Sequence, residues 1–348
     1  MHRAMKGHPA KVPAMTSVVL PRPALPLRLV APGLALCLAL ALLAMAGQAV
    51  LGIAALSPLV LALILGVAWR NTLGTIAVLQ PGIAFSLKRV LRAGVVLLGF
   101  QLTLTQAASV GVSGLAVIAV TLVATFTVTK LLGRLLGVPA PLAELIAAGS
   151  SICGASAVIA VNTVTNVDDE DVAYAIACVT VFGTLAMLGA PMLAAAIDLG
   201  PRAYGLWTGA SIHEVAQVVG AAFARGEEAG HFGTIAKLSR VMLLAPLILT
   251  LGALRRERAA GAARPPLPWF VFGFIAVVLL NTVLPPAPAL HAAIARGTAF
   301  LLTVALAAMG LETDIRRLKA RGLRPLALGA LAAVFISGLA FALVQLVA

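Results

Sequence analysis

The stretch Gly149-Ser150-Ser151-Ile152-Cys153-Gly154-Ala155-Ser156 interrupts an apolar segment that runs from about Leu142 to Val164. Glycine weakens a helix, and serine competes for backbone hydrogen bonds. Inside a bilayer, broken backbone is tolerated only where protein buries it or where it lines a wet cavity. The stretch therefore predicts a discontinuous helix whose break faces a substrate path. The alternative is close helix packing, because small residues also line helix contacts in membranes.

The composition is that of a membrane protein. Of the 348 residues, 61% are hydrophobic and 11% are charged, and the mean hydropathy is +1.07. Soluble globular domains are about half apolar and about a quarter charged, so we expect an all-α polytopic membrane protein instead. The net charge of +13 would suggest nucleic acid in a soluble protein. Here the basic residues fall mostly in short loops between apolar segments, where they set orientation.

Hydropathy divides the chain into segments of about 20 residues, the length of a membrane span. We predict eleven spans, at residues 31–48, 52–69, 90–107, 113–131, 142–163, 172–196, 203–223, 233–253, 268–285, 293–310 and 325–346. Ten is the alternative count. Residues 70–89 are apolar but interrupted by Pro81, and an interfacial helix on the inner face is one interpretation of them. Residues 1–27 are expected to form a disordered cytoplasmic tail, and residues 28–348 a single transmembrane transporter domain.

The charges between spans predict the orientation. With the N-terminus in the cytoplasm, the basic clusters fall inside, and the C-terminus is periplasmic. The expected inner residues are Arg70, Lys88, Arg89, Arg92, Lys130, Arg134, Arg202, Arg255, Arg256, Arg258, Arg264, Arg316, Arg317, Lys319, Arg321 and Arg324. The expected outer residues are Arg225, Arg296 and the acidic run Asp168-Asp169-Glu170-Asp171.

A short internal similarity links two span ends. Gly99-Phe100-Gln101-Leu102-Thr103 precedes Gly111, and Gly310-Leu311-Glu312-Thr313-Asp314 precedes Gly322. The two copies lie on opposite sides of the membrane in the predicted topology. This arrangement is typical of the inverted-topology repeats of secondary transporters. Chance is the alternative in a chain so rich in alanine, leucine and glycine.

A second polar segment, Gly209–Val218, lies within a predicted span. His213, Glu214 and Gln217 share one helix face there, and ionisable residues inside a span mark a functional path by default. The alternative is a buried hydrogen-bonded cluster that ties helices together. Because Gly209-Ala210-Ser211-Ile212 is similar to Gly149-Ser150-Ser151-Ile152, we predict two interrupted helices that meet near the midplane.

The motifs argue against an enzyme, a cofactor or a metal site. The segment His213–Gln217 differs from the zinc-protease motif HExxH at its last residue, and glutamine is a poor zinc ligand. No Walker A motif or G-x-S-x-G elbow is present, so transport must use an ion gradient or a separate motor subunit. The other histidines, which lie in the tail or in expected outer loops, are His2, His8, His231 and His291. The cysteines lie in apolar segments without a disulfide or zinc spacing; they are Cys37, Cys153 and Cys178.

The two interruptions together predict a site for a small anion. Backbone N–H groups at half-helix N-termini bind anions, and serine hydroxyls add donors. The expected substrate-binding residues are Ser150, Ser151, Gly154, Ser156 and Ser211, and the expected coupling or ion-binding residues are His213, Glu214, Gln217 and Arg240.

Three charged residues near this site leave alternatives open. Arg240 is expected either to pair with Glu214 or to face the bound anion. Lys237 is a further candidate for binding the anion, and the slightly favoured alternative is a side chain that snorkels toward the outer interface. Glu144 either interacts with the N-terminus of its own helix or is solvated.

Five segments resemble one known family. In order they are Leu97–Thr103, Gly149–Ala157, Val181–Thr184, His213–Val219 and Leu238–Met242. They are similar to the YeiH-like family of bacterial inner-membrane proteins, which carries the label sulfate exporter. The resemblance covers about residue 31 to the end. One departure is Gln101, where family members often carry a basic residue, so an anion role is not carried over to this position.

The resemblance implies a carrier of bile-acid-symporter-like architecture, with inverted repeats and crossed broken helices, in the bacterial inner membrane. Together with the residues, it predicts a secondary active transporter of a small anion such as sulfate or an organosulfonate. The coupling ion would be H⁺ or Na⁺, and a homodimer is one candidate assembly. The alternative function is a membrane-embedded binding or regulatory subunit of a larger complex, without independent transport.

Overall fold

The computed structural model describes residues 26–51, 57–108, 110–165, 167–254, 269–316 and 322–347. Every regular element in these ranges is a helix, which confirms the expected all-α membrane protein. The helices long and apolar enough to cross a bilayer are α1 (Leu27–Leu51), α6 (Gly111–Leu135), α9 (Asp169–Ala196), α12 with α13 (Glu227–Met242 and Leu244–Leu254), α15 (Pro288–Glu312) and α16 (Leu323–Val347). The expected tail, except its last two residues, and the basic residues Arg255, Arg256, Arg258, Arg264, Arg317, Lys319 and Arg321 lie outside the described residues.

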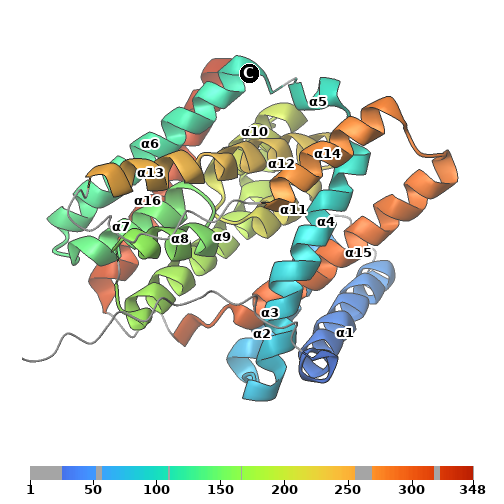
Figure 1. Ribbon diagram of the computed structural model, residues 1–348, viewed down its shortest axis with the longest axis horizontal. Helices are drawn as coiled ribbons and strands as arrows, with labels where there is room; N and C mark the ends of the chain where they lie inside the picture. The colour runs from blue at the N-terminus through green and yellow to red at the C-terminus, as the bar shows by residue number, and fades with distance from the viewer. Residues whose placement is uncertain are drawn as a thin grey trace, which may run out of the picture.

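The helices form two groups (Figure 1). The framework bundle, on the right of the view, contains α1, α2 (Pro58–Thr72), α3 (Gln80–Phe85), α4 (Leu91–Leu98), α14 (Trp269–Val283) and α15. The hairpin bundle, on the left, contains α6 to α13 and α16. The short helix α5 (Leu104–Ala108) lies on the connection from α4 to α6.

The third span begins earlier than the hydropathy predicts. A 3₁₀ turn (Ala77–Leu79), α3, a π-helical segment (Ser86–Val90) and α4 follow one another without a break. Pro81 stands in the first turn of α3, where its missing N–H has no helical partner to lose. The interpretation of residues 70–89 as a separate interfacial helix is therefore wrong.

Glycine pairs hold the framework bundle together at backbone distance. Gly66 of α2 faces Gly310 of α15, and a Cβ on Gly66 would stand 2.9 Å from the Cα of Gly310. Close backbone approach of this kind is how membrane helices pack without a hydrophobic driving force. At the ends of the same two helices, Arg70 forms an ion pair with Asp314 at 2.9 Å.

The first interrupted segment folds back on itself. It consists of α7 (Ala140–Ser151) and α8 (Ala155–Thr165), with Gly154 between them at φ +64°. A Cβ on Gly149 would stand 2.8 Å from the side chain of Val158, a contact that only a reversal of direction allows. Each half is about 17 Å long at 1.5 Å per residue, well short of the roughly 30 Å hydrocarbon core.

The second interrupted segment is also a hairpin, and it enters from the opposite side. It consists of α10 (Pro201–Ser211) and α11 (Val215–Phe223). The Tyr204 hydroxyl donates to the Ala221 carbonyl at 2.9 Å, near the open end of the hairpin. In Figure 1 the two hairpins point toward each other across the bundle.

The predicted breaks are confirmed, but their direction was not foreseen. We expected residues 142–163 and 203–223 each to cross the membrane; both instead turn back at the break. The predicted count of spans therefore falls by two. Hydropathy identifies apolar length and does not report the direction in which the chain leaves a break.

The fold-back also changes two predicted sides. The acidic run Asp168–Asp171 follows α8, so it lies on the side where α6 ends with Lys130 and Arg134. Arg202 lies on the opposite side, where its Nε is 4.0 Å from the Glu228 carboxylate. Relative to Lys130 and Arg134, the predicted side of the acidic run and the predicted side of Arg202 were therefore both wrong. The reason is that a re-entrant segment returns the chain to its starting side.

Cysteine labelling tests this topology. Arg134→Cys and Asp168→Cys should react with a membrane-impermeant maleimide from the same side, and Arg202→Cys should react from the other. The native cysteines Cys37, Cys153 and Cys178 are buried and give little background. Labelling of oriented vesicles measures this, and reaction of the first two variants from opposite sides would contradict the hairpin.

The two copies of the internal similarity have matching surroundings. Gly111 has φ +66° and Gly322 has φ +81°, and the 25-residue helices α6 and α16 begin there. These helices are antiparallel neighbours, since a Cβ on Gly133 near the end of α6 would stand 3.3 Å from Leu328 near the start of α16. The inverted-repeat relationship and the bile-acid-symporter-like architecture stay predictions.

Candidate functional site

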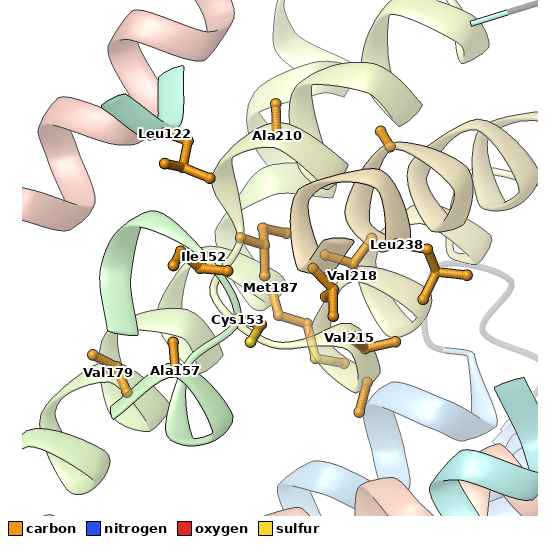
Figure 2. Close-up of a cluster of buried hydrophobic side chains, with 14 of the residues drawn as sticks. Leu122, Ile152, Cys153, Ala157, Val179, Met187, Ala210, Val215, Val218 and Leu238 are labelled. Atoms are coloured by element: carbon orange, nitrogen blue, oxygen red, sulfur yellow. The ribbon is translucent and has the colours of Figure 1, made fainter. Parts of the chain in front are cut away.

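The two hairpin tips, residues 152–154 and 212–214, meet inside the hairpin bundle. A Cβ on Gly154 would stand 2.4 Å from Cγ of Glu214, so the two tips are in direct contact. Apolar side chains surround them. Figure 2 shows Ile152 and Cys153 between Ala157 of α8 and Val215 of α11, with Met187 of α9 beside them.

Lys237 and Arg240 of α12 bind the backbone carbonyls of both tips, and both side chains are fully buried. The ammonium of Lys237 donates to the carbonyls of Ile152 (2.7 Å), Ile212 (2.8 Å) and His213 (2.5 Å). The guanidinium of Arg240 donates to the carbonyls of Ser150 (2.5 Å), Ser151 (2.6 Å), Ala210 (2.8 Å) and Ile212 (3.0 Å). The last carbonyls of a helix have no helical partner and carry partial negative charge. The two cations therefore cap the C-terminal ends of α7 and α10.

These contacts correct two expectations. Arg240 pairs with carbonyls instead of with Glu214, and its hydrogen bonds point at the protein instead of at a free anion. Lys237 does not snorkel, because its ammonium reaches the bundle interior, where it is 0% exposed. Hydropathy places a lysine within a span but does not show whether buried carbonyls are there to accept hydrogen bonds from its ammonium.

Small residues bring α12 close enough for this capping. A Cβ on Gly209 of α10 would stand 2.5 Å from the Gly233 carbonyl of α12. A Cβ on Gly205, one turn earlier, would stand 2.6 Å from the Ala229 carbonyl. Small residues thus serve close helix packing at the α10–α12 contact.

Glu214 lies at the N-terminal ends of the other two half-helices, α8 and α11. Its carboxylate accepts from the Thr180 hydroxyl of α9 at 2.8 Å and from the Ala155 N–H at the start of α8. It also forms a reciprocal capping box with Gln217 at the start of α11. Helix N-termini carry partial positive charge and favour a carboxylate, so one acid serves two helix starts.

Gln217 connects this carboxylate to α9. Its Oε1 accepts from the Glu214 N–H at 3.0 Å, and its Nε2 donates to the Thr180 carbonyl at 2.9 Å and to the Thr184 hydroxyl at 3.3 Å. Gly183 makes room for the amide, since a Cβ there would stand 2.1 Å from Oε1. The sequence reasoning missed Thr180 and Thr184 as site residues, although their four-residue spacing puts both on one helix face.

The serines do not gather their hydroxyls at one point. The Ser151 hydroxyl donates to the Ala148 carbonyl at 3.4 Å, and the Ser211 hydroxyl donates to the Trp207 carbonyl at 2.7 Å, each within its own helix. Ser156 is exposed in the first turn of α8. The Ser150 hydroxyl is buried without a hydrogen-bond partner among the described residues.

His213 lies in the second tip and is 1% exposed. Neither of its ring nitrogens has a hydrogen-bond partner within the part of the chain that the structure describes. It is therefore a buried polar group beside the two cations, and its expected coupling role stays a prediction.

Glu144 belongs to a different contact. It is buried, and its carboxylate lies 3.3 Å from the ammonium of Lys130. The alternative that Glu144 is solvated is wrong. This pair fixes α7 against α6, outside the tips.

A cavity of about 300 Å³ lies in the seam between the two bundles, beside α2, α9 and the end of α15. Its lining is mostly apolar and includes Thr184, the partner of Gln217, and Thr313 at the end of α15. The remaining lining residues are Leu63, Ile64, Val67, Ala68, Val181, Leu185, Leu188 and Ile315.

Apolar helices of membrane-spanning length, with two opposed hairpins, define a multi-pass helical membrane protein. The chain belongs to the family described as Conserved hypothetical protein 698, also designated UPF0324, whose model matches residues 32–329. The resemblance to YeiH-like proteins is thereby confirmed.

The relatives are similar over most of their length. A UPF0324 membrane protein of Pseudomonas aeruginosa is 40% identical over 291 residues, which is 79% of this chain and 82% of the relative. The UPF0324 inner membrane protein YeiH of Salmonella typhimurium is 38% identical over 307 residues (85% and 88%). YeiH of Escherichia coli K12 is 36% identical over 308 residues (85% and 88%). No solved structure matches the chain.

Proposed function

We propose that the protein is a secondary active transporter of a small anion, sulfate or an organosulfonate-like relative, driven by a gradient of H⁺ or Na⁺. The observation that carries the proposal is the meeting of two opposed hairpin tips beside two buried cations and one carboxylate. Re-entrant backbone at membrane depth is tolerated where it lines a path, and substrate sites of secondary transporters lie at broken helices near the midplane.

The charges at the tips favour an anion. Two half-helix C-termini and two N-termini meet there, and their partial charges of about half a unit each cancel. Lys237 and Arg240 then exceed Glu214 by one positive charge among the described residues, with His213 counted as neutral. A buried site with this excess favours an anionic substrate, whose charge would neutralise it.

The donors at the tips fit an oxyanion. The first turn of α8 offers backbone N–H groups beside exposed Ser156, and helix N-termini bind sulfate and phosphate. The carbonyls at the tips are taken by Lys237 and Arg240, so fewer oxygens remain for a cation.

The membrane location follows from the relatives. YeiH of Escherichia coli is named an inner membrane protein, and we infer the same membrane for this chain, with a cytoplasmic N-terminus and a periplasmic C-terminus. We infer no enzymatic activity, because the sequence carries no Walker A motif or G-x-S-x-G elbow and has Gln217 where HExxH has its second histidine.

Flux through purified protein in liposomes tests the proposal. Radiolabelled sulfate, sulfite and methanesulfonate should accumulate under an imposed proton or sodium gradient and should not accumulate in protein-free liposomes. A carrier moves solute alone, whereas a binding or regulatory subunit binds it without flux. Absence of flux for all three anions under both gradients would overturn the transport proposal and favour the subunit.

A further inference from the structure

Resting on the proposed function, we infer that the Glu214 carboxylate occupies the binding site of the substrate anion. The carboxylate must take up a proton before a substrate anion can replace it. Each anion would then enter together with one proton. This anion site consists of the backbone N–H donors at the starts of α8 and α11 and the Thr180 hydroxyl.

The partners of Glu214 are those that a free oxyanion would use. The Thr180 hydroxyl and the Ala155 N–H both donate to its carboxylate, and the capping box adds an N–H from α11. Hydroxyl and backbone N–H donors at a helix N-terminus form charge-assisted hydrogen bonds with carboxylate and sulfate alike. An ionised Glu214 and a substrate anion therefore compete for the same donors.

The geometry differs from that of an ordinary helix cap. In the usual capping box, a serine or threonine is the N-cap and a glutamate or glutamine is the third residue. Here the acid is the N-cap, glutamine is the third residue, and the carboxylate also reaches the other hairpin past Gly154. Glu214 is only half-buried, whereas Lys237 and Arg240 are fully buried. Of the three charged residues, Glu214 is thus the one that solvent reaches.

The surroundings limit what else can exchange a proton with it. The ionisable groups that act on Glu214 are Lys237 of α12 and Cys153 of the first tip, and His213 precedes it in the chain. Lys237 is held by three carbonyls. The element packed on the other side, α9, contributes Thr180, which does not titrate in this range.

Charge balance gives the exchange a definite stoichiometry. A proton from water adds to one oxygen of the carboxylate, and the freed donors pass to the incoming anion. The tips then carry two positive charges, from Lys237 and Arg240. A dianion with one proton neutralises them, whereas a monoanion leaves one charge unbalanced. The geometry thus points to co-transport of one proton with one dianion.

The test compares the wild type with Glu214→Gln, whose amide has the same shape and no proton to release. In the wild type, sulfate binding should strengthen as pH falls, by about tenfold per pH unit where Glu214 is ionised. In Glu214→Gln the binding should not change with pH. Sulfate–sulfate exchange should persist in this variant, and proton-driven accumulation should be lost. Glu228→Gln, an exposed acid beside Arg202, is the matched control and should keep the wild-type pH dependence.

A second measurement covers a variant that fails to fold. A pH-sensitive dye inside liposomes should record about one proton entering the lumen per sulfate carried by the wild type. Zero protons per sulfate, or an unchanged pH dependence in a folded Glu214→Gln, would overturn the inference while leaving anion transport standing. Absence of sulfate binding and flux in the wild type would overturn the proposed function, and the inference with it.

Discussion

Arg240→Met should lower the melting temperature of the purified protein by roughly 4–13 °C. The substitution removes the side-chain donor from the carbonyls of Ser150, Ser151 and Ala210, while Ile212 keeps its bond to Lys237. Each buried polar group left unpaired costs about 1–3 kcal/mol, so the three carbonyls together cost about 3–9 kcal/mol. In a chain of this length, each kcal/mol shifts the midpoint by about 1.4 °C. Thermal unfolding in detergent measures this.

The matched control is Arg202→Met, which removes an arginine at the start of α10, the helix whose other end Arg240 caps. Arg202 is largely exposed, and its 4.0 Å ion pair with Glu228 is a surface contact. The melting temperature of the Arg202→Met variant should therefore stay near that of the wild type. Equal losses in both variants would show that the buried caps contribute no more than a surface charge. Arg240→Lys should lie between the two, because an ammonium cannot present the guanidinium fork.

Gly183→Ala should reduce transport at least about tenfold and destabilise the protein by about 1–3 kcal/mol, as overpacking does. The added methyl would stand 2.1 Å from Oε1 of Gln217, which must move. Gln217 would then lose its bonds to the Glu214 N–H and the Thr180 carbonyl. Sulfate flux in liposomes and thermal unfolding measure the two effects.

Gly189→Ala provides the comparison within the same helix. A Cβ at Gly189 meets nothing within 4 Å, and alanine favours a helix over glycine by about 1 kcal/mol. This variant should be as active as wild type and equally or slightly more stable. Similar activity losses in the two variants would mean that helix α9 as a whole, and not the position of Gln217, governs transport.

The breaks themselves were predictable from the sequence. Glycine and serine inside apolar segments weaken a helix, and both interruptions lie where the two Gly-x-Ser-Ile segments indicated. The prediction that His213, Glu214 and Gln217 share one helix face was wrong, because residues 212–214 form the break between α10 and α11. Glu214 and Gln217 nevertheless meet, through the capping box at the start of α11. The family followed from the same segments.

The reversal at each break was not predictable in the same way. A weakened helix can kink or turn back, and the outcome depends on contacts such as Tyr204 with Ala221, which are distant from the break. Pro81 was similarly ambiguous, because a proline starts a helix as readily as it interrupts one. The role of Lys237 depended on three carbonyls from two hairpins, and no local pattern in α12 encodes that meeting.

The shared caps have a mechanical consequence. Lys237 and Arg240 each donate hydrogen bonds to carbonyls of both hairpins. Withdrawal of one hairpin alone would therefore leave buried carbonyls without a hydrogen-bond donor. The two hairpins therefore move as a single piece with α12. If the protein is the transporter proposed above, alternating exposure of the site to the two sides of the membrane would not come from opening one hairpin at a time. It would come from sliding of the hairpin bundle along its seam with the glycine-paired framework.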